Sequence, residues 1–114
     1  MLNPNIPKIL KQGEGISIEF KECKSALTKE VYETVCAFLN RNGGELLLGV
    51  KDNGEIQGID EDKITQIKKD FVTAINNPQK MSPPVYLSIE EIKIKGKLIL
   101  YIFIPIGSDR KSVV

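Results

Sequence analysis

The sequence of 114 residues predicts a single domain that combines helices and β-strands, with its first two long strands side by side. Three patterns support this prediction. Residues 16–22 alternate between apolar and polar side chains, residues 29–41 carry apolar side chains every three or four positions, and residues 46–50 are apolar at almost consecutive positions. With 41% hydrophobic and 27% charged residues, the chain has the composition of a globular protein that can form one hydrophobic core without disulfides or structural metal ions.

Residues 1–13 are expected to form a lead-in with about one helical turn. The alternating segment 16–22 predicts a first strand with one buried face. Its inward side chains would be Ile16, Ile18 and Phe20, and its outward ones Glu19 and Lys21.

Thr28 is suitably placed to cap a helix of about 29–41, whose core stripe is Val31, Val35, Phe38 and Leu39. Asn42 or Gly43 would then take the left-handed conformation that ends many helices. Gly43 and Gly44 therefore predict a sharp turn into a second strand that lies beside the first. Because residues 46–50 lose the alternation, that strand should be covered on both faces.

The sequence Asp52-Asn-Gly54 is a strong hairpin signal, and residues 55–59 are predicted to be a short return strand. Asp60 is a candidate cap for a second helix of about 61–76. Residues 85–95 and 97–105 predict a hairpin that turns at Gly96, with 98–104 as a central strand. The alternation slips at residues 90–91, which indicates a bulge or a bend.

Composition excludes several classes of function. The chain has no histidine, which rules out Ser-His-Asp and Cys-His catalysis and imidazole metal sites. Its two cysteines are too few for a disulfide framework, and no signal peptide or membrane-length apolar run is present. We therefore expect a cytoplasmic protein with reduced thiols and no membrane partner. The net charge of +1 is not that of a general polyanion binder.

Three carboxylates are candidates for chemistry. Glu14 and Glu19 flank the start of the first strand, and they can meet only if the chain turns at Gly13 or Gly15. Asp52 follows the second strand and would approach Glu19 if the two strands are neighbours. Three carboxylates without imidazole suit Mg²⁺ or Mn²⁺. The alternatives are a solvated strand face for Glu19 and an ordinary turn residue in Asp52.

Basic residues gather late in the chain. Lys93, Lys95 and Lys97 alternate, which would place three cations on one side of the last hairpin, and Arg110 and Lys111 follow. Such a hairpin is either a phosphate-contacting ribbon or a solubilising edge that blocks strand pairing. Lys21 lies on the same strand face as Glu19, where it would contact a phosphate or pair with an acid. No Walker A loop and no other cofactor motif is present, so no cofactor is expected beyond Mg²⁺ or Mn²⁺ in a nuclease.

Several of these segments together resemble one family. Glu14-Gly-Ile-Ser-Ile-Glu-Phe-Lys21 is similar to the Glu-x-x-x-x-Glu-Phe-Lys opening of the Schlafen AlbA_2 domain, once called a divergent AAA domain. Residues 37–44 resemble its Ala-Phe-Ala-Asn-Thr-x-Gly-Gly, and residues 47–59 its Leu-Ile-Gly-Val-Asp-Asp-x-Gly-x-Ile-x-Gly-Val. The chain departs from this pattern at Leu39, Arg41 and Lys51, and Lys51 would weaken a metal site or add a phosphate contact.

The resemblance implies an AlbA_2-like α+β fold, in which a mixed β-sheet packs against two main helices. It also implies a DNA-binding domain of a bacterial transcriptional regulator. It implies that residues 1–114 are an N-terminal piece of a longer protein, because a final strand usually follows in the family. In the vertebrate Schlafen branch three acids form a metal-dependent RNA-cleaving site, and Glu14, Glu19 and Asp52 match them by position. An endonuclease is therefore the enzymatic alternative. A homodimerisation module is the third hypothesis, because the strands of the last hairpin could pair across a dimer. The vertebrate branch uses a doubled domain, which a single copy could imitate only by dimerising.

Overall fold

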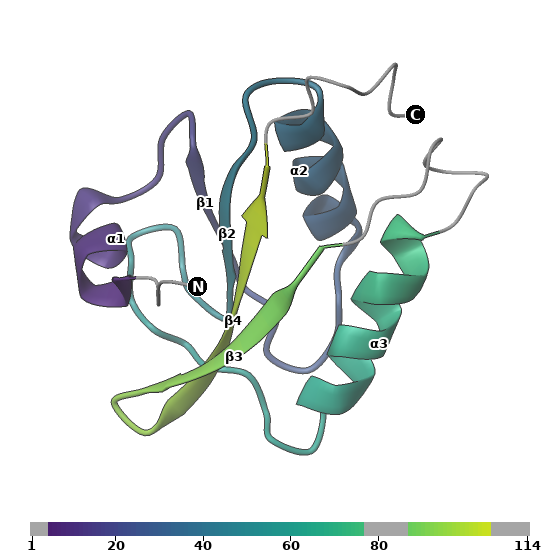
Figure 1. The fold of residues 1–114 in the computed structure, drawn as a ribbon. Coiled ribbons are helices and arrows are strands. Elements are labelled where there is room, and N and C mark those ends of the chain that lie inside the picture. The colour runs from purple at the N-terminus through teal and green to yellow at the C-terminus, as the bar shows by residue number, and fades with distance from the viewer. Residues whose placement is uncertain (1–4, 77–86, 106–114) are drawn as a thin grey trace.

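The computed structural model describes residues 5–76 and 87–105, which form three helices and one four-stranded sheet (Figure 1). In chain order the elements are α1 (Ile6–Gln12), β1 (Ile18–Lys21), α2 (Lys29–Leu39), β2 (Gly44–Leu48), α3 (Ile64–Ile75), β3 (Ile89–Ile94) and β4 (Lys97–Ile104). The α+β class with a mixed sheet is confirmed. Within the described ranges, no helix is long and apolar enough to cross a membrane.

The strand order in the sheet is β1-β2-β4-β3. β1 pairs with β2 in parallel, while β4 pairs with both β2 and β3 in antiparallel orientation. The prediction that the first two strands lie side by side is therefore correct, as is the central place of β4. A parallel pair needs a crossover connection, and α2 provides it.

The helices cover the two faces of the sheet unequally (Figure 1). α2 and α3 lie on one face over a core that includes Leu46, Leu48 and Phe71, whereas α1 lies on the other over a core that includes Phe20 and Leu47. The consecutive leucines of β2 thus point alternately into two cores. This arrangement confirms that the strand is covered on both faces and explains why its sequence does not alternate.

The corner between α2 and β2 depends on two glycines. Gly43, rather than Asn42, takes the left-handed conformation, with φ +76°. Its N–H donates to the Phe38 carbonyl oxygen at 2.9 Å, which satisfies one of the carbonyls left open at the helix end. α2 itself ends at Leu39, two residues before the predicted end. Thr28 is at the N-cap position, although its side chain makes no capping hydrogen bond.

Three predictions about strands are wrong. β1 begins at Ile18, and Ile16, which was expected to point inward, is 80% exposed. The chain turns through Gly15, whose N–H donates to the Ile18 carbonyl oxygen, so Ile16 lies in that turn. Residues 55–59 form no strand, only the isolated bridges Val50–Ile56 and Ile59–Leu98.

The third wrong prediction is the bulge, one of the two alternatives predicted at residues 90–91: β3 pairs with β4 in unbroken register from Ile89 to Ile94, so no residue is inserted there. The apolar residues of β3 change phase because Ile89 packs on the α2–α3 side and Ile92 on the α1 side. The hairpin does turn at Gly96, as predicted. The predicted start of this hairpin at residue 85 lies outside the described residues.

Asp60 does not cap α3, which begins at Ile64 with Lys63 as its N-cap. Instead the Asp60 carbonyl oxygen accepts a hydrogen bond from the Lys63 N–H, so a separate turn precedes the helix. The predicted core stripe of this helix is buried as expected: Ile64, Ile67, Phe71 and Ile75.

Candidate nucleic-acid interface

The turn between α1 and β1 brings Glu14 back beside the sheet. Glu14 Oε2 accepts a hydrogen bond of 2.9 Å from the Phe20 N–H, on the side of β1 where the described residues supply no neighbouring strand. Burial raises the pKa of Glu19, and the adjoining Glu14 carboxyl raises it further through charge repulsion and a hydrogen bond. Lys21 acts in the opposite direction, with its Nζ 3.6 Å from Glu19 Oε2. The carboxyl groups of Glu14 and Glu19 are therefore neighbours, because the chain turns at Gly15 before β1 begins.

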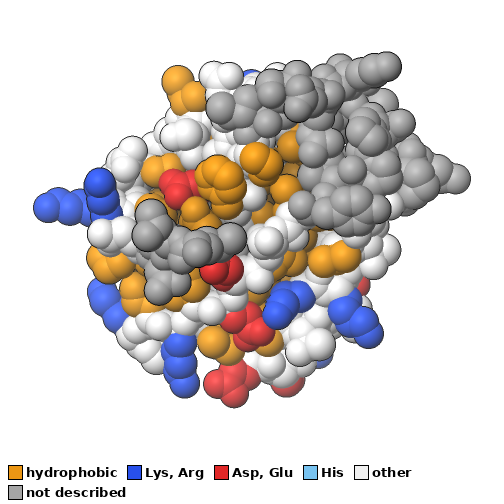
Figure 2. Space-filling view, in the orientation of Figure 1, with side chains coloured by type: hydrophobic (Ala, Val, Ile, Leu, Met, Phe, Trp, Pro, Cys, Tyr) orange, Lys and Arg blue, Asp and Glu red, His pale blue; other side chains and the backbone are white. Residues whose placement is uncertain are grey.

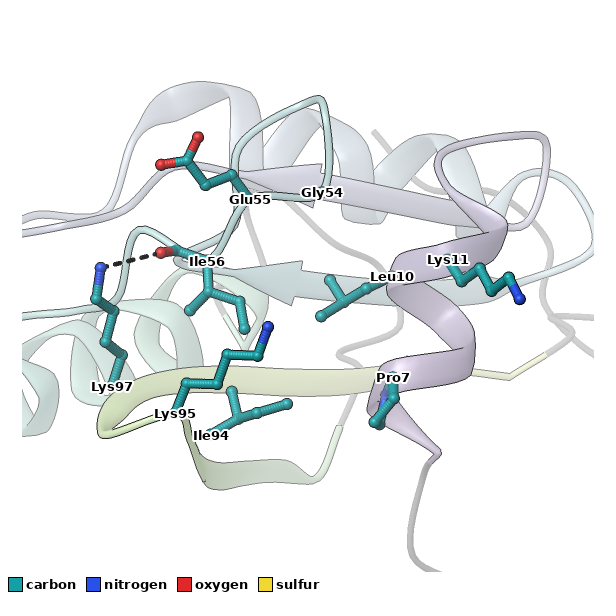
Figure 3. A pocket seen from close by; sticks show the side chains of 9 residues that line it. All are labelled: Pro7, Leu10, Lys11, Gly54, Glu55, Ile56, Ile94, Lys95 and Lys97. Atoms are coloured by element: carbon teal, nitrogen blue, oxygen red, sulfur yellow. Dashed lines mark hydrogen bonds between the residues drawn. The ribbon is translucent and has the colours of Figure 1, made fainter.

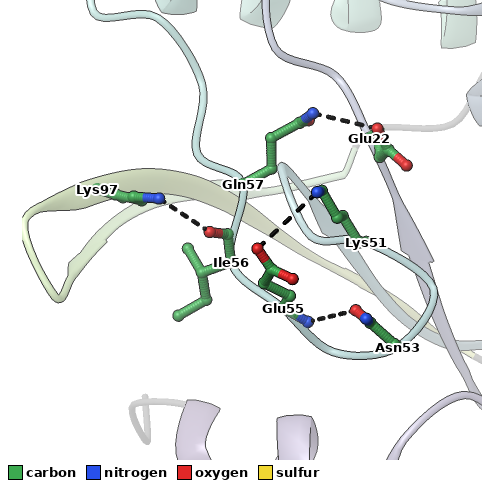
Figure 4. Close-up of polar contacts among 7 residues, drawn as sticks. All are labelled: Glu22, Lys51, Asn53, Glu55, Ile56, Gln57 and Lys97. Atoms are coloured by element: carbon green, nitrogen blue, oxygen red, sulfur yellow. Dashed lines mark hydrogen bonds and ion pairs between the residues drawn. The ribbon is translucent and has the colours of Figure 1, made fainter.

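Asp52 lies in a separate turn that closes on itself. The Gly54 N–H donates to the Lys51 carbonyl oxygen at 2.8 Å, and Asn53 Oδ1 accepts from the Glu55 N–H at 2.9 Å (Figure 4). Asp52 is exposed, and it is not among the groups that shift the pKa of Glu19. In the described part of the chain, no three acidic or cysteine side chains are grouped closely enough to hold a metal ion. The structure thus joins two of the three predicted carboxylates but does not add the third.

The predicted basic residues differ in how their charges are compensated. Lys21 pairs with Glu19, and Lys51 pairs with Glu55 at 3.8 Å. Lys93 lies opposite Leu98 in the sheet, whereas Lys97 lies opposite Ile94. Because directly paired residues share a face, Lys93 and Lys97 are on opposite faces, and the expectation of three cations on one side is wrong.

Arg110 and Lys111 lie outside the described residues. Within the described residues, Lys93 and Lys95 have no carboxylate partner. Lys97 donates from Nζ to the Ile56 carbonyl oxygen at 3.3 Å and likewise has no carboxylate partner there (Figure 4).

Lys95 and Lys97 lie at a groove between α1, the 54–56 segment and the tip of the β3–β4 hairpin (Figure 3). Its volume is about 510 Å³, within the range of about 300–1,000 Å³ typical of ligand pockets. The lining is apolar in the side chains of Pro7, Leu10, Ile56 and Ile94, and basic in those of Lys11, Lys95 and Lys97. Among the described residues, Glu55 is the one acidic residue in this lining, and Lys51 is its ion-pair partner.

Lys11 also lines this groove, although no pattern in the sequence predicted it. It lies in the last turn of α1, which the sequence predicted only as a single turn in a lead-in segment. Figure 2 shows the wider setting: hydrophobic side chains gather in the upper and middle part of the visible face. Lys and Arg side chains project at its left and lower-left margins and also right of centre, with acidic side chains between them. A basic end is therefore built from parts of the chain that are about 85 residues apart.

Comparison with known proteins now identifies the fold. A family model for Schlafen, AlbA_2 matches residues 14–113. The chain belongs to the Schlafen AlbA_2 family. The match covers both glutamates, Asp52 and the β3–β4 hairpin but begins after α1.

Two solved structures are similar to this AlbA_2 domain. The solution NMR structure of the N-terminal domain of a protein from Nitrosomonas europaea, described as related to the ATP-dependent DNA helicase RecG, has a TM-score of 0.68 and 25% sequence identity. That match covers 91% of this chain and 74% of the other. The crystal structure of the DIP2311 protein from Corynebacterium diphtheriae has a TM-score of 0.57 and 18% identity, over 90% of this chain and 24% of the other. The second likeness shows the fold alone.

Proposed function

We propose that this AlbA_2 domain binds nucleic acid, DNA in the first place, as one module of a larger regulator or helicase-related protein. The observation that carries the proposal is the basic end formed by Lys11, Lys95 and Lys97. Among the described residues none of the three has a carboxylate partner, so their charges are available to phosphates. The RecG-related relative supports DNA as the ligand.

The proposal predicts a definite salt dependence. Three phosphate contacts give a slope of log affinity against log salt of about −2 for a single strand. Affinity should therefore fall roughly 20-fold between about 50 and 200 mM salt. Fluorescence anisotropy with a labelled oligonucleotide measures both quantities directly.

Single substitutions Lys11→Ala, Lys95→Ala and Lys97→Ala should each reduce the slope by about 0.7. Lys69→Ala is the matched control, because Lys69 is an exposed lysine on α3, which lies on the opposite face of the sheet. The proposal would be refuted if the domain did not bind the oligonucleotide at low salt. It would also be refuted if a variant that combines all three lysine substitutions kept full affinity.

A second candidate function, metal-dependent cleavage of nucleic acid, is favoured by the meeting of Glu14 and Glu19. A carboxyl whose pKa is raised by a carboxyl neighbour is common at functional sites. The described residues supply only two of the three acids, and Glu14 already accepts the Phe20 N–H, so the fit to Mg²⁺ or Mn²⁺ is incomplete. Cleavage of RNA or DNA in Mn²⁺ that is lost in Glu19→Gln would support this function, and cleavage unchanged in Glu19→Gln would exclude that residue.

A further inference from the structure

We propose that the groove between α1 and the β3–β4 hairpin holds an unpaired base, so that the domain prefers single-stranded nucleic acid to duplex. This inference rests on the proposed function and specifies its ligand. It comes from the composition of the groove, in which the apolar side chains of Leu10, Ile56 and Ile94 (the floor) lie beside Lys95 and Lys97 (the rim), while Lys11 projects outward from α1 (Figure 3).

The floor is a surface for a flat apolar group. Leu10 and Ile94 are half-buried and pack on the α1-side core, which leaves part of each side chain facing the groove. Pro7 extends this surface on α1, and Ile56 closes it from the loop side. A ligand that carried only negative charge would make no favourable contact with these apolar side chains. A nucleotide can bury a face of its base against them while its phosphate stays in contact with the lysines.

The rim is arranged for an anion. The Nζ of Lys97 uses one donor on the Ile56 carbonyl oxygen, which fixes the side chain and leaves two donors for a ligand. Lys95 has φ +53°, and no other non-glycine residue in the described part of the chain has a positive φ. A two-residue turn with positive φ at both positions favours Asn or Gly, so a lysine there carries a small conformational cost. We attribute the presence of lysine at this position to the positive charge that it places beside the groove.

The floor also explains why the strand should be single. In a duplex the faces of the bases are stacked and only their edges can be reached, so the apolar floor of a groove cannot contact a ring face. An unpaired base can turn outward while its flanking phosphates stay on the rim, as in proteins that bind single strands by contacting base faces. Here the contacting side chains are aliphatic rather than aromatic, so we expect a modest contribution for each base.

The test compares the intact domain with substitutions on the floor and on the rim. The probes are a fluorescein-labelled oligothymidine of about 12 nucleotides and a fluorescein-labelled DNA hairpin with a G·C-rich stem of about 12 base pairs, which stays paired at low salt. The wild-type domain should bind the single strand more tightly. Ile94→Thr keeps a β-branched residue in β3 but removes apolar contact, and it should weaken single-strand binding about 4-fold, equivalent to one buried methylene group. Leu10→Gln, which suits a helix, should act in the same direction.

Two matched controls accompany these variants. Val72→Thr makes the same kind of change at an exposed apolar residue of α3, and Lys93→Ala removes a lysine of the same hairpin that lies on the opposite face from Lys97. Both should leave affinity for the oligothymidine unchanged. Thermal melting of each variant establishes that it is folded, and polyglutamate of matched length should not displace the oligonucleotide.

The outcomes separate the two proposals. If single strand and duplex bind equally, or if the floor variants bind like wild type while the lysine variants do not, the base-binding groove is wrong and the nucleic-acid function stands. If polyglutamate competes fully, the surface binds anions in general and the groove proposal is overturned. If neither probe binds at low salt, the proposed function itself fails.

Discussion

Replacing Gly43 by alanine should destabilise the domain more than any exposed substitution, because the α2–β2 corner leaves no room for a methyl group. A Cβ at Gly43 would lie 2.8 Å from the carbonyl carbon of Pro105 and 2.9 Å from its oxygen, and closer still to the Ile104 carbonyl oxygen. These are backbone atoms at the end of the central strand β4, so they cannot swing aside as a side chain would. The φ of +76° adds a second cost for any residue with a side chain.

The magnitude follows from these two terms. The left-handed conformation costs about 1–2 kcal/mol for an L-residue, and forcing an extra carbon into a packed site costs about 1–3 kcal/mol. The free energy of unfolding should therefore fall by about 2–5 kcal/mol, out of a total of about 5–15 kcal/mol. For 114 residues the entropy of unfolding near Tm is about 0.24 kcal/mol/K, so Tm should fall by about 8–20 °C.

Urea unfolding monitored by circular dichroism, together with a thermal scan, measures both quantities. Gly96→Ala is the matched control, because Gly96 has nearly the same φ, +77°, and a Cβ there would meet nothing within 4 Å. It should lose only the conformational term of about 1–2 kcal/mol. If Gly43→Ala loses no more than Gly96→Ala, the close approach of β4 does not determine the corner and the reasoning is refuted.

Three further predictions concern burial and protonation. Phe20→Ala empties a fully buried site beneath α1 and should cost about 3–5 kcal/mol in urea unfolding, so a loss below about 1 kcal/mol would contradict the assigned core. Burial raises the pKa of Glu19 above 4.5, so the folded state keeps a proton that the unfolded chain releases. The resulting stabilisation of the folded state is complete below pH of about 4.5. It is lost as the pH rises through the pKa that Glu19 has in the folded state. Glu19→Gln should abolish this decline in unfolding experiments at several pH values, and an unchanged pH profile would show that other groups cause it. Burial raises the pKa of Cys23 from 9.0 to about 11, so its thiolate at pH of about 8 should be about 100-fold scarcer than in the unfolded chain. In a Cys36→Ser background, Ellman's reagent should modify Cys23 slowly in the native state and rapidly in urea, whereas equal rates would contradict its burial.

The sheet could be predicted from the sequence wherever a local pattern of apolar residues and glycines fits only one structure. The leucines of β2 and the glycines after α2 fixed a buried strand beside β1, because both the pattern and the turn require it. Ile16 was misplaced because alternation extends by one step into a turn, and only the hydrogen bond from Gly15 to Ile18 shows where the strand begins. In β3 the phase slip was real, but its cause was two cores on two faces rather than a bulge.

The candidate site was predicted less completely than the fold. The sequence left the meeting of Glu14 and Glu19 conditional on a turn at Gly13 or Gly15, since the two are too far apart along an extended strand. The alternation of Lys93, Lys95 and Lys97 did not place them on one face, because residues 95 and 96 form the turn and Ile94 pairs with Lys97. Alternation alone does not show which residues of a hairpin belong to its turn. Lys11 carried no local signal at all, because its role arises from where α1 packs.

Helix α1 connects the two candidate sites, and it is the part of the domain that the family pattern describes least. It has seven residues, too few for an isolated helix to persist in water, so it depends on tertiary contacts. Ile6 and Ile9 supply them by packing on the core beneath, and Asn5 Oδ1 caps its first turn by accepting the Lys8 N–H. Its last turn carries the groove lysine, and the turn that follows delivers Glu14 to the sheet. Because the family match begins at residue 14, the α1 wall of the groove is outside the shared pattern. The sheet and the carboxylate pair are thus features that a family alignment can detect, whereas ligand preference set by this wall can differ between members with the same fold.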